Sequence, residues 1–179
     1  DHTARNPYTS EFSLDLLGAV IDRAGGEPAV LIGNSAGGRV AIEYALAHPE
    51  QVAALVLISP AVYTDGPPPI ARLVSRLPQV DRLGPLILRW ALPRFGPDGI
   101  GLAWHDPSRV TSEIREGYAL PLRARYWDMA LWEFSQSRRP VPLLARLAEL
   151  RATRVLVVTG DDDRIVPTTD SERFAKEID

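Results

Sequence analysis

The sequence predicts an α/β protein in which a parallel sheet with flanking helices is interrupted by an inserted helical segment. Two short apolar runs lie on either side of an amphipathic helical stretch within the first 60 residues. A glycine-rich turn joins the first of these runs to that stretch. The strand pattern then disappears over residues 66–150 and returns near the C-terminus. These observations together indicate one sheet that the chain leaves and later rejoins.

Helical and strand patterns alternate in the first part of the chain. Apolar side chains recur at helical spacing over residues 10–24, with Thr9 or Ser10 available as the N-cap. The run 29–32 is too short for a helix and continuous enough for a strand that is buried on both faces. The next helix is predicted over 37–48 and a second buried strand over 53–58. Together with the first strand they form a parallel crossover.

Helical patterns dominate the insertion, which also contains all four tryptophans. Its helices are expected near 70–77, 81–94, 110–119, 123–137 and 141–150. The strand pattern resumes at 155–158, and a last helix is expected over 169–178. The chain is therefore divided into core residues 1–65, a helical cap segment 66–150 and core residues 151–179.

The composition excludes several classes of protein. Of the 179 residues, 45% are hydrophobic and 24% are charged, as in an ordinary globular protein. The net charge of −3 gives no electrostatic footprint for nucleic acid, and no stretch reaches the ~18 apolar residues of a membrane span. The lack of cysteine excludes disulfides, thiolate zinc sites and cysteine nucleophiles. We expect a cytoplasmic protein and make no prediction of its oligomeric state.

The turn from Gly33 to Gly37 has the pattern G-x-S-x-G, with Ser35 at its centre. It lies between a predicted strand and a predicted helix, the context in which this pattern presents a nucleophilic serine. Both glycines are expected because side chains two positions either side of a strained serine would collide. The turn would raise Oγ of Ser35 above the carboxyl edge of the sheet. It would also aim the N–H of Ala36 at a developing oxyanion.

Other glycine-rich turns fit the sequence less well. A dinucleotide-binding loop would need glycine where Ser35 stands, and a P-loop would need a Lys-Ser/Thr ending. A turn that merely joins a strand to a helix remains the alternative without a function.

Three aspartates, Asp161, Asp162 and Asp163, follow the third predicted strand. A carboxylate just beyond a parallel strand lies on the same edge of the sheet as Ser35. There it can hold the N–H of an imidazole and stabilise the imidazolium that forms during catalysis. A divalent-cation site is disfavoured, because consecutive side chains cannot all converge and EF-hand spacing is absent. A solvated acidic loop is the other alternative, and we expect neither a metal nor a cofactor.

These residues together resemble the α/β-hydrolase superfamily over nearly the whole chain. Residues 29–60 look like the nucleophile strand, helix and following strand of cap-bearing members, and 160–167 are similar to the family's G-x-x-D-x-x-V-P turn. The resemblance implies a partial α/β-hydrolase fold with an inserted helical cap. It assigns the triad acid to Asp163 and gives the two preceding aspartates a role in shaping the loop. Bacterial esterases and the carbon–carbon bond hydrolases of aromatic degradation are the most similar groups, whereas haloalkane dehalogenases and epoxide hydrolases have aspartate in place of Ser35.

The resemblance also implies parts that lie outside this sequence. In the family, a helix and a strand separate the acid from the histidine, but this sequence ends 16 residues after Asp163. The second oxyanion donor would come from a loop before residue 1. We therefore expect an excerpt of a longer protein. Its three strands would be neighbours at one side of the sheet, with open edges and reduced helix cover.

The three histidines of the sequence are poor substitutes for the missing base. His48 lies at the far end of the helix that starts at Ser35, roughly 18–20 Å away at about 1.5 Å per residue. His2 lies in the N-terminal leader. His105 belongs to the cap, where it could at most face the substrate.

The cap is expected to roof the serine and to determine selectivity. Arg123 and Arg125 could meet a substrate carboxylate, although surface ion pairing is the favoured interpretation. Asn34 and several aromatic side chains are candidates for substrate binding, and the alternative is that the aromatic residues only hold the cap helices together. The aromatic candidates are Tyr63, Trp90, Trp104, Trp127 and Trp132.

The predicted function is carboxylesterase-like hydrolysis of a small ester or apolar carbonyl compound. The mechanism would be of the cofactor-free Ser-His-Asp type, with the histidine outside these 179 residues. Acyl transfer or perhydrolysis would use the same residues with another acceptor. The alternative is a non-catalytic protein that binds a small apolar ligand, or an inactive remnant of the fold.

Overall fold

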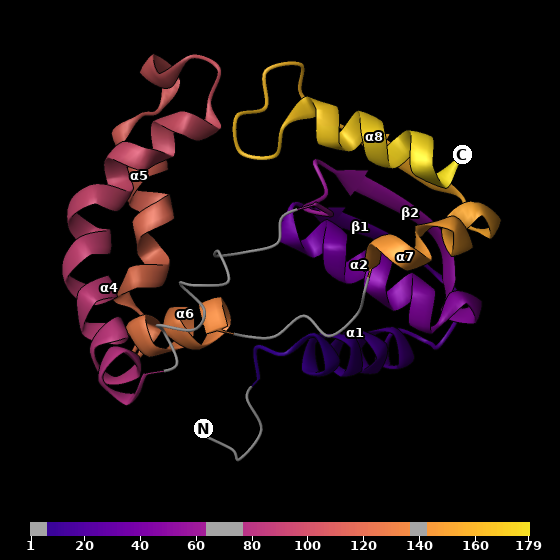
Figure 1. The fold of residues 1–179 in the computed structure, drawn as a ribbon, viewed down its shortest axis with the longest axis horizontal. Helices are drawn as coiled ribbons and strands as arrows, with labels where there is room; N and C mark the ends of the chain where they lie inside the picture. The colour runs from indigo at the N-terminus through magenta and orange to yellow at the C-terminus, as the bar shows by residue number, and fades with distance from the viewer. Residues whose placement is uncertain (1–6, 64–76, 137–142) are drawn as a thin grey trace. The chain divides into compact units, whose positions relative to one another are not determined.

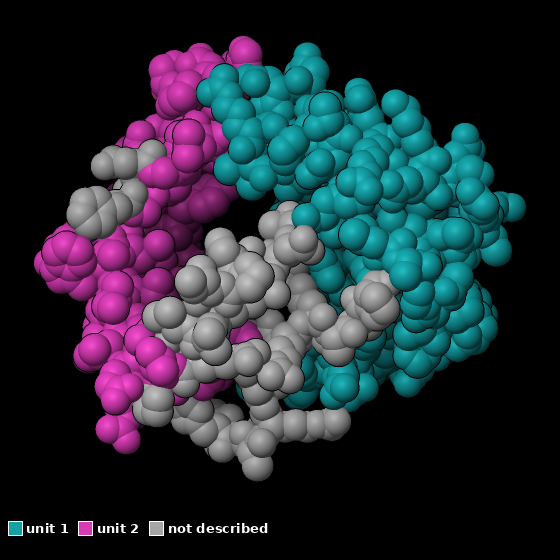
Figure 2. Space-filling model, in the orientation of Figure 1, with its two compact units in different colours: residues 1–64, 138–179 teal, residues 65–137 magenta. Residues whose placement is uncertain are grey.

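The computed structural model of this chain describes residues 7–63, 77–136 and 143–179 (Figure 1). The chain forms two compact units, which Figure 2 distinguishes by colour. Unit 1 comprises residues 1–64 and 138–179, and unit 2 comprises residues 65–137. Across the described ranges, every helix is too short or too polar to cross a membrane.

Unit 1 has the predicted α/β character, with strands and helices in alternation. Its elements are α1 (Ser10–Arg23), β1 (Ala29–Asn34), α2 (Ala36–Ala47), the 3-10 helix η1 (Pro49–Gln51), β2 (Val52–Ile58), α7 (Leu143–Arg146), the 3-10 helix η5 (Leu147–Ala152), β3 (Val155–Val158) and α8 (Thr168–Ile178). Each predicted strand is confirmed, with ends that differ by at most two residues from those expected.

The three strands of unit 1 form a parallel sheet in the order β1-β2-β3. Asn34 at the end of β1 pairs with Ile58, and Ile58 pairs with Val158 at the end of β3. The carboxyl ends of all three strands therefore meet at one edge of the sheet, which is where parallel sheets carry their functional residues.

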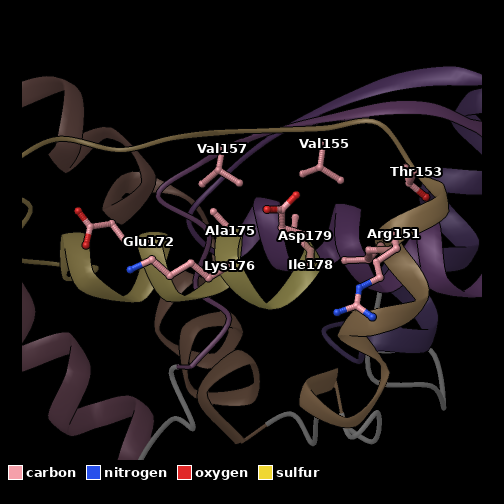
Figure 3. A pocket seen from close by; sticks show the side chains of 10 residues that line it. Arg151, Thr153, Val155, Val157, Glu172, Ala175, Lys176, Ile178 and Asp179 are labelled. Carbon is pink, nitrogen blue, oxygen red and sulfur yellow. The ribbon is translucent and has the colours of Figure 1, made fainter.

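One face of this sheet packs against helices. Leu31 and Leu57 are buried in a core that also contains Ile42 of α2 and Phe174 of α8. Figure 3 shows Val155 and Val157 of β3 pointing towards α8. Burial of these apolar side chains is the main source of stability for the unit.

The opposite face of the sheet is exposed in the described part of the chain. The prediction that run 29–32 is buried on both faces is therefore wrong. Helices α2 and α8 both supply the core on the first face, so the alternate side chains of the outer strands β1 and β3 are left uncovered. These side chains are Val30 (57% exposed), Ile32 (70%), Leu156 (57%) and Val158 (43%).

Helix α2 carries an ion pair inside the core. Arg39 and Glu43 are both buried, and Nε of Arg39 lies 2.8 Å from Oε1 of Glu43. Arg39 also donates from Nη1 to the carbonyl of Val62 at 3.4 Å. The pair therefore connects the helix that follows Ser35 to the segment that follows β2.

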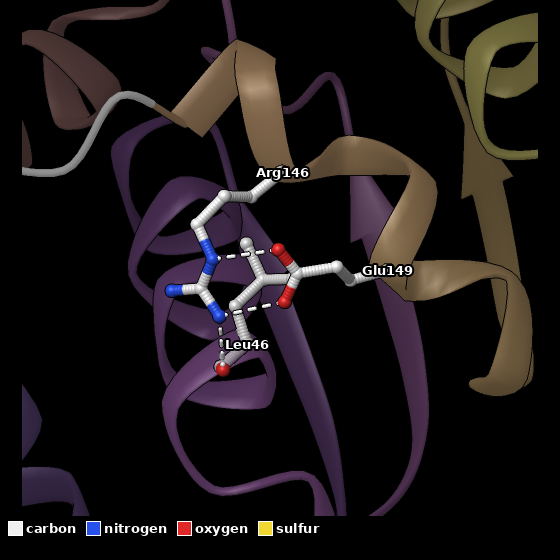
Figure 4. A network of polar contacts seen from close by, with 3 residues as sticks. All are labelled: Leu46, Arg146 and Glu149. Carbon is white, nitrogen blue, oxygen red and sulfur yellow. Dashed lines mark hydrogen bonds and ion pairs between the residues drawn. The ribbon is translucent and has the colours of Figure 1, made fainter.

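Residues 143–152 belong to unit 1, although the sequence analysis placed the end of the cap at residue 150. Arg146 donates from Nη2 to the carbonyl of Leu46 in the last turn of α2 at 2.8 Å, and it binds both carboxylate oxygens of Glu149 (Figure 4). A cation at a helix C-terminus is favourable because the last carbonyl groups accept no hydrogen bond within the helix and carry a partial negative charge. The boundary of the insertion thus falls earlier than expected, because apolar side chains of this segment reach the core. These are Leu143, Leu147 and Leu150.

The regular elements in the described residues of unit 2 are all helices. Nε1 of Trp132 donates to Oδ1 of Asp81 at 2.9 Å, which connects α6 (Trp127–Gln136) to α4 (Pro78–Gly99), and the Trp132 ring packs against Gly84. Oγ1 of Thr111 caps α5 by accepting the N–H of Ile114. The helix expected near 70–77 falls almost entirely outside the described residues. The elements are α4 (Pro78–Gly99), η2 (Ile100–Ala103), η3 (Pro107–Arg109), α5 (Ser112–Ala119), η4 (Leu120–Arg123) and α6 (Trp127–Gln136).

Candidate active site

The strand ends of unit 1 bring the two predicted catalytic residues to the same edge of the sheet. Ser35 directly follows β1, and Asp163 lies in the loop between β3 and α8. Neighbouring strands are about 4.8 Å apart, so the ends of β1 and β3, with β2 between them, are separated by about 10 Å. The segment that follows β2 therefore lies between the serine and the aspartate.

Ser35 occupies a backbone conformation that side chains rarely adopt, with φ 50° and ψ −118°. It stands at the N-cap position of α2, where a serine normally accepts a backbone N–H with its hydroxyl. Thr9 and Thr111 do so for α1 and α5, but the Ser35 side chain does not cap α2. The Ser35 N–H instead donates to the carbonyl of Ile58 at 2.9 Å. The strained turn thus holds the backbone and leaves the hydroxyl unused by the helix.

The structure changes the expected role of the glycines around this turn. A Cβ added to Gly33 would lie 2.6 Å from the backbone of both Gly37 and Gly38, so the need for glycine there is confirmed. A Cβ added to Gly37 would meet nothing within 4 Å, so the expected collision at that position is wrong. Gly38 is the second confined glycine, because its Cβ would lie 3.0 Å from Pro60. Helix α2 begins at Ala36, which turns Gly37 outwards and Gly38 towards the strand ends.

The two residues that flank Ser35 have distinct positions. Ala36 is the first residue of α2, so its N–H is one of those that have no acceptor inside the helix. Its role as an oxyanion donor stays a prediction. The Asn34 side chain donates from Nδ2 to the carbonyl of Ile58 at 3.2 Å, the same carbonyl that binds the Ser35 N–H. Asn34 therefore fastens the turn to β2, and its contact with substrate stays a prediction.

Asp163 differs from its neighbours in its contacts. Its Oδ1 accepts the N–H groups of Ile165 and Val166, each at 2.9 Å. Burial raises the pKa of the Asp163 carboxyl, but hydrogen bonds from the Ser59 side chain and from these two N–H groups outweigh it and hold the pKa below its usual value. Asp162 pairs with Arg164 at 2.8 Å. Asp163 is thus the member of the acidic turn whose carboxylate is held by backbone N–H groups of its own loop.

Ser59 is a residue of this site that the sequence analysis missed. It is the first residue after β2, is buried, and has a φ of 42°. Its position at the end of the middle strand was the available signal, because functional side chains gather at such ends. Serines are common after strands, so this position alone did not identify Ser59 as a site residue.

The histidines in the described ranges are His48 and His105, and His2 lies outside them. His48 ends α2, as expected, where its ring stacks at 4.8 Å from the Tyr44 ring and its Nδ1 lies 3.9 Å from Glu50. His105 is exposed in unit 2. Within the described part of unit 1, therefore, no histidine is within reach of Ser35.

Tyr63, a candidate for substrate binding, is engaged by α8. Its hydroxyl donates to Oε2 of Glu177 at 2.8 Å, and the Arg173 guanidinium lies 4.2 Å from the centre of its ring. Burial and the hydrogen bond to Glu177 raise the pKa of the Tyr63 phenol above its usual value, so it stays neutral. These contacts favour a structural role for Tyr63.

The tryptophan candidates all lie in unit 2. Trp104 packs edge-on against Tyr118 with ring centres 5.8 Å apart, and Trp132 joins α4 to α6. Trp127 begins α6, and the exposed Trp90 has the Arg94 guanidinium 5.0 Å from its ring centre. Their contact with substrate stays a prediction.

A groove of about 790 Å³ lies between β3 and α8 (Figure 3). Val155, Val157, Glu172 and Lys176 are among the residues that line it, and none of the candidate site residues does. The described residues contain no group of three or more histidines or carboxylates that could hold a metal ion. The strand-end residues therefore remain the best candidate for an active site.

Comparison with known proteins agrees with this geometry. Residues 9–179 match the model of the family described as serine aminopeptidase, S33, which is an α/β-hydrolase family. The chain belongs to this family. The resemblance to the α/β-hydrolase superfamily is thereby confirmed, and so is the α/β fold class.

Several α/β-hydrolases are similar to this chain. Lipase LipV of Mycobacterium tuberculosis (strain ATCC 25618 / H37Rv) is 42% identical over 128 residues, which are 70% of this chain and 46% of the lipase. A 2-hydroxy-6-oxo-6-phenylhexa-2,4-dienoate hydrolase of Burkholderia cepacia is 30% identical over 155 residues, or 83% of this chain and 51% of that enzyme. This chain thus spans about half the length of these curated relatives.

Solved structures of α/β-hydrolases superimpose on nearly all of this chain. The 2-hydroxy-6-oxo-6-phenylhexa-2,4-dienoate hydrolase of Rhodococcus sp. strain RHA1 has a TM-score of 0.72 at 21% identity, and the match covers 99% of this chain and 64% of that one. A thermophilic esterase from Thermogutta terrifontis has a TM-score of 0.68 at 25% identity, covering 95% and 60%. The shared feature at these identities is the fold.

Proposed function

We propose that this protein is a serine hydrolase in which Ser35 is the nucleophile and Asp163 is the acid of a Ser-His-Asp triad. The observation that carries the proposal is the conformation of Ser35, a non-glycine residue at φ 50° between β1 and α2 whose side chain does not cap the helix. Backbone strain of this kind persists only where the surrounding structure imposes it, and it gathers at functional sites.

The proposed reaction is attack of the Ser35 hydroxyl oxygen on a carbonyl carbon to form an acyl-enzyme. A histidine accepts the hydroxyl proton and later passes it to the leaving group, and water then hydrolyses the acyl-enzyme. The N–H of Ala36 at the start of α2 would donate to the oxyanion, where the helix dipole would add to the stabilisation. Asp163, held ionised by its loop, would orient the imidazole.

A small carboxylic ester is the proposed substrate class. The family membership and the similarity to a lipase support an ester, and the similarity to a dienoate hydrolase supports cleavage of a carbon–carbon bond next to a carbonyl group as the second choice. Both reactions place a carbonyl group at Ser35 and use water as the acceptor of the acyl group. Cleavage of the carbon–carbon bond would also need a conjugated substrate, which takes up the electron pair of the broken bond and is then protonated.

A second candidate is a non-catalytic protein that binds a small apolar ligand. It is favoured by one observation, namely that the described residues of unit 1 bring no histidine near Ser35. The two candidates differ in whether the Ser35 hydroxyl is reactive, and a covalent probe distinguishes them.

The test uses a fluorophosphonate probe and a p-nitrophenyl ester on the full-length gene product. Labelling and hydrolysis are expected in the natural protein, are lost in Ser35→Ala, and fall by at least about a thousandfold in Asp163→Asn, as for loss of a triad acid. Ser112→Ala, on the exposed start of α5, is the matched control and keeps full activity. Absence of labelling in the natural protein, or equal labelling of Ser35→Ala, would overturn the proposal in favour of the ligand-binding protein.

A further inference from the structure

A hydrogen bond closes the loop that carries Asp163. This acidic loop, residues 159–167, leaves β3 after Val158 and ends where α8 begins at Thr168. The Thr168 hydroxyl donates from Oγ1 to the carbonyl oxygen of Gly160 at 2.6 Å. The distance lies at the short end of the range for O–H···O hydrogen bonds. The bond therefore joins the two ends of the loop, across eight positions of the sequence.

Thr168 uses its hydroxyl for the loop and not for its own helix. It is the first residue of α8, and Pro167 at the N-cap position offers this helix no side-chain hydrogen bond. The threonines before α1 and α5 behave differently, because Oγ1 of Thr9 and of Thr111 accepts an N–H of the helix that follows. The bond to Gly160 is thus not explained by helix capping.

Both ends of the acidic loop are anchored in unit 1. Val158, the last residue of β3, pairs with Ile58 of β2 and so fixes the start of the loop to the sheet. Val166 and Phe174 are 5% and 0% exposed, so the core holds the end of the loop and the helix after it. The Thr168 hydroxyl therefore connects two anchored parts of the chain.

Inside the loop, the Asp163 carboxylate is held by local contacts. Its Oδ1 accepts the N–H groups of Ile165 and Val166, each at 2.9 Å. These bonds fix the carboxylate relative to the residues that follow it, but not relative to β3. Closure at Gly160 fixes the loop to the end of β3, at the edge of the sheet that also carries Ser35.

We propose that Thr168 is a positioning residue, which closes the acidic loop and so holds the Asp163 carboxylate in place at the edge of the sheet. The proposal rests on the proposed function, because it takes Asp163 as the acid of the triad. A bond between the loop ends restricts the backbone conformations of the residues between them. Without it, the Asp163 carboxylate would sample more positions and would hold the imidazole less firmly. A local loss of order of this kind leaves the core of the unit intact.

The test removes the Thr168 hydroxyl in the full-length gene product and measures Asp163 and Ser35 separately. Thr168→Val removes the hydroxyl and keeps the branched shape, whereas Thr168→Ser keeps the hydroxyl and removes the methyl group. Thr169→Val is the matched control, because it makes the same change at the next, exposed residue of α8. Carbon NMR of protein labelled at aspartate gives the pKa of the Asp163 carboxyl group, and the rate of fluorophosphonate labelling reports the reactivity of Ser35.

Thr168→Val is expected to raise the pKa of Asp163 by about half a unit, since a looser loop stabilises the ionised carboxylate less. The rate of Ser35 labelling should fall about two- to tenfold, the range to which the net contribution of one hydrogen bond corresponds. Thr168→Ser and Thr169→Val should leave both quantities close to those of the natural protein, because each keeps a hydroxyl at position 168. Urea unfolding curves confirm that folded proteins are compared.

The inference is overturned if Thr168→Val leaves the pKa of Asp163 or the labelling rate unchanged, or if Thr168→Ser or Thr169→Val changes them as much. Failure of the proposed function gives a different result, because the natural protein itself is then not labelled at Ser35. The pKa of Asp163 still shows in that case whether Thr168 holds the loop.

Discussion

Gly33 and Gly37 flank Ser35 symmetrically in the sequence, yet only Gly33 is confined by its surroundings. An added Cβ at Gly33 would lie 2.6 Å from backbone atoms that cannot move without distorting the turn, whereas Gly37 has no neighbour within 4 Å. The end of β1 passes close to the first turn of α2, because the chain reverses sharply at Ser35. The steric restriction therefore falls on Gly33, which precedes the serine.

Alanine substitutions at these two glycines should therefore have opposite effects. Gly33→Ala is expected to lower the free energy of unfolding by about 1–3 kcal/mol or more, as for an overpacked core. Gly37→Ala lies in the first turn of α2 and should be neutral or stabilising by up to about 1 kcal/mol, because alanine favours the helix. Urea unfolding curves of the two variants give the comparison. Equal losses of stability would show that the open space at Gly37 is not present in solution.

At the scale of elements, α2 joins the nucleophile to the core through a buried charge pair. Arg39 and Glu43 are one turn apart, their side chains are 10% and 1% exposed, and Arg39 also reaches the Val62 carbonyl. Burying two charges costs solvation free energy, and their attraction offsets that cost only while both are present.

Loss of one member of this pair should be far more damaging than loss of both. Glu43→Leu leaves the Arg39 charge buried without its carboxylate, and it is expected to cost about 3–5 kcal/mol of unfolding free energy. The double variant Arg39→Met with Glu43→Leu replaces the pair by apolar groups of similar size, so its loss should be at least about 2 kcal/mol smaller. A double-mutant cycle in urea measures the coupling. A single variant within about 0.5 kcal/mol of the natural protein would mean that the pair is solvated.

The elements also show how far local sequence patterns reach. The strand at 155–158 and the helix from residue 10 follow the predictions closely, because periodicity and capping are properties of the residues themselves. The turn at Ser35 could also be predicted from the sequence, since its motif stands between a strand and a helix. The place of Ser59 beside the acidic loop could not be predicted, because it depends on β2 lying between β1 and β3. That relation is not encoded near residue 59.

At the scale of the whole molecule, the uncovered face of the sheet is the largest departure from what the sequence suggested. A run such as 29–32 has the same composition whether helices cover one face or both, so burial on both faces was the natural expectation. In the described residues the apolar side chains of that face remain exposed, from Val30 and Ile32 on β1 to Leu156 and Val158 on β3. Strand β2 lies between them and presents the half-buried Val56 and the exposed Ile58 on the same face. A face of this kind, with apolar side chains on each strand, binds apolar molecules more readily than scattered apolar side chains do.

The 179-residue chain should consequently bind the apolar dye ANS at this face. Threonine keeps the preference for a strand and removes apolar surface, so Ile32→Thr combined with Leu156→Thr should reduce dye fluorescence by on the order of half. Stability should change by no more than about 0.5 kcal/mol per residue, because both side chains are exposed. Leu144→Thr, which removes another exposed leucine (49% exposed) from α7, is the control and should leave the fluorescence nearly unchanged. If the sheet variants bind as much dye as the natural chain, this face is covered in solution and the alternating exposure of β1 and β3 does not describe the protein there.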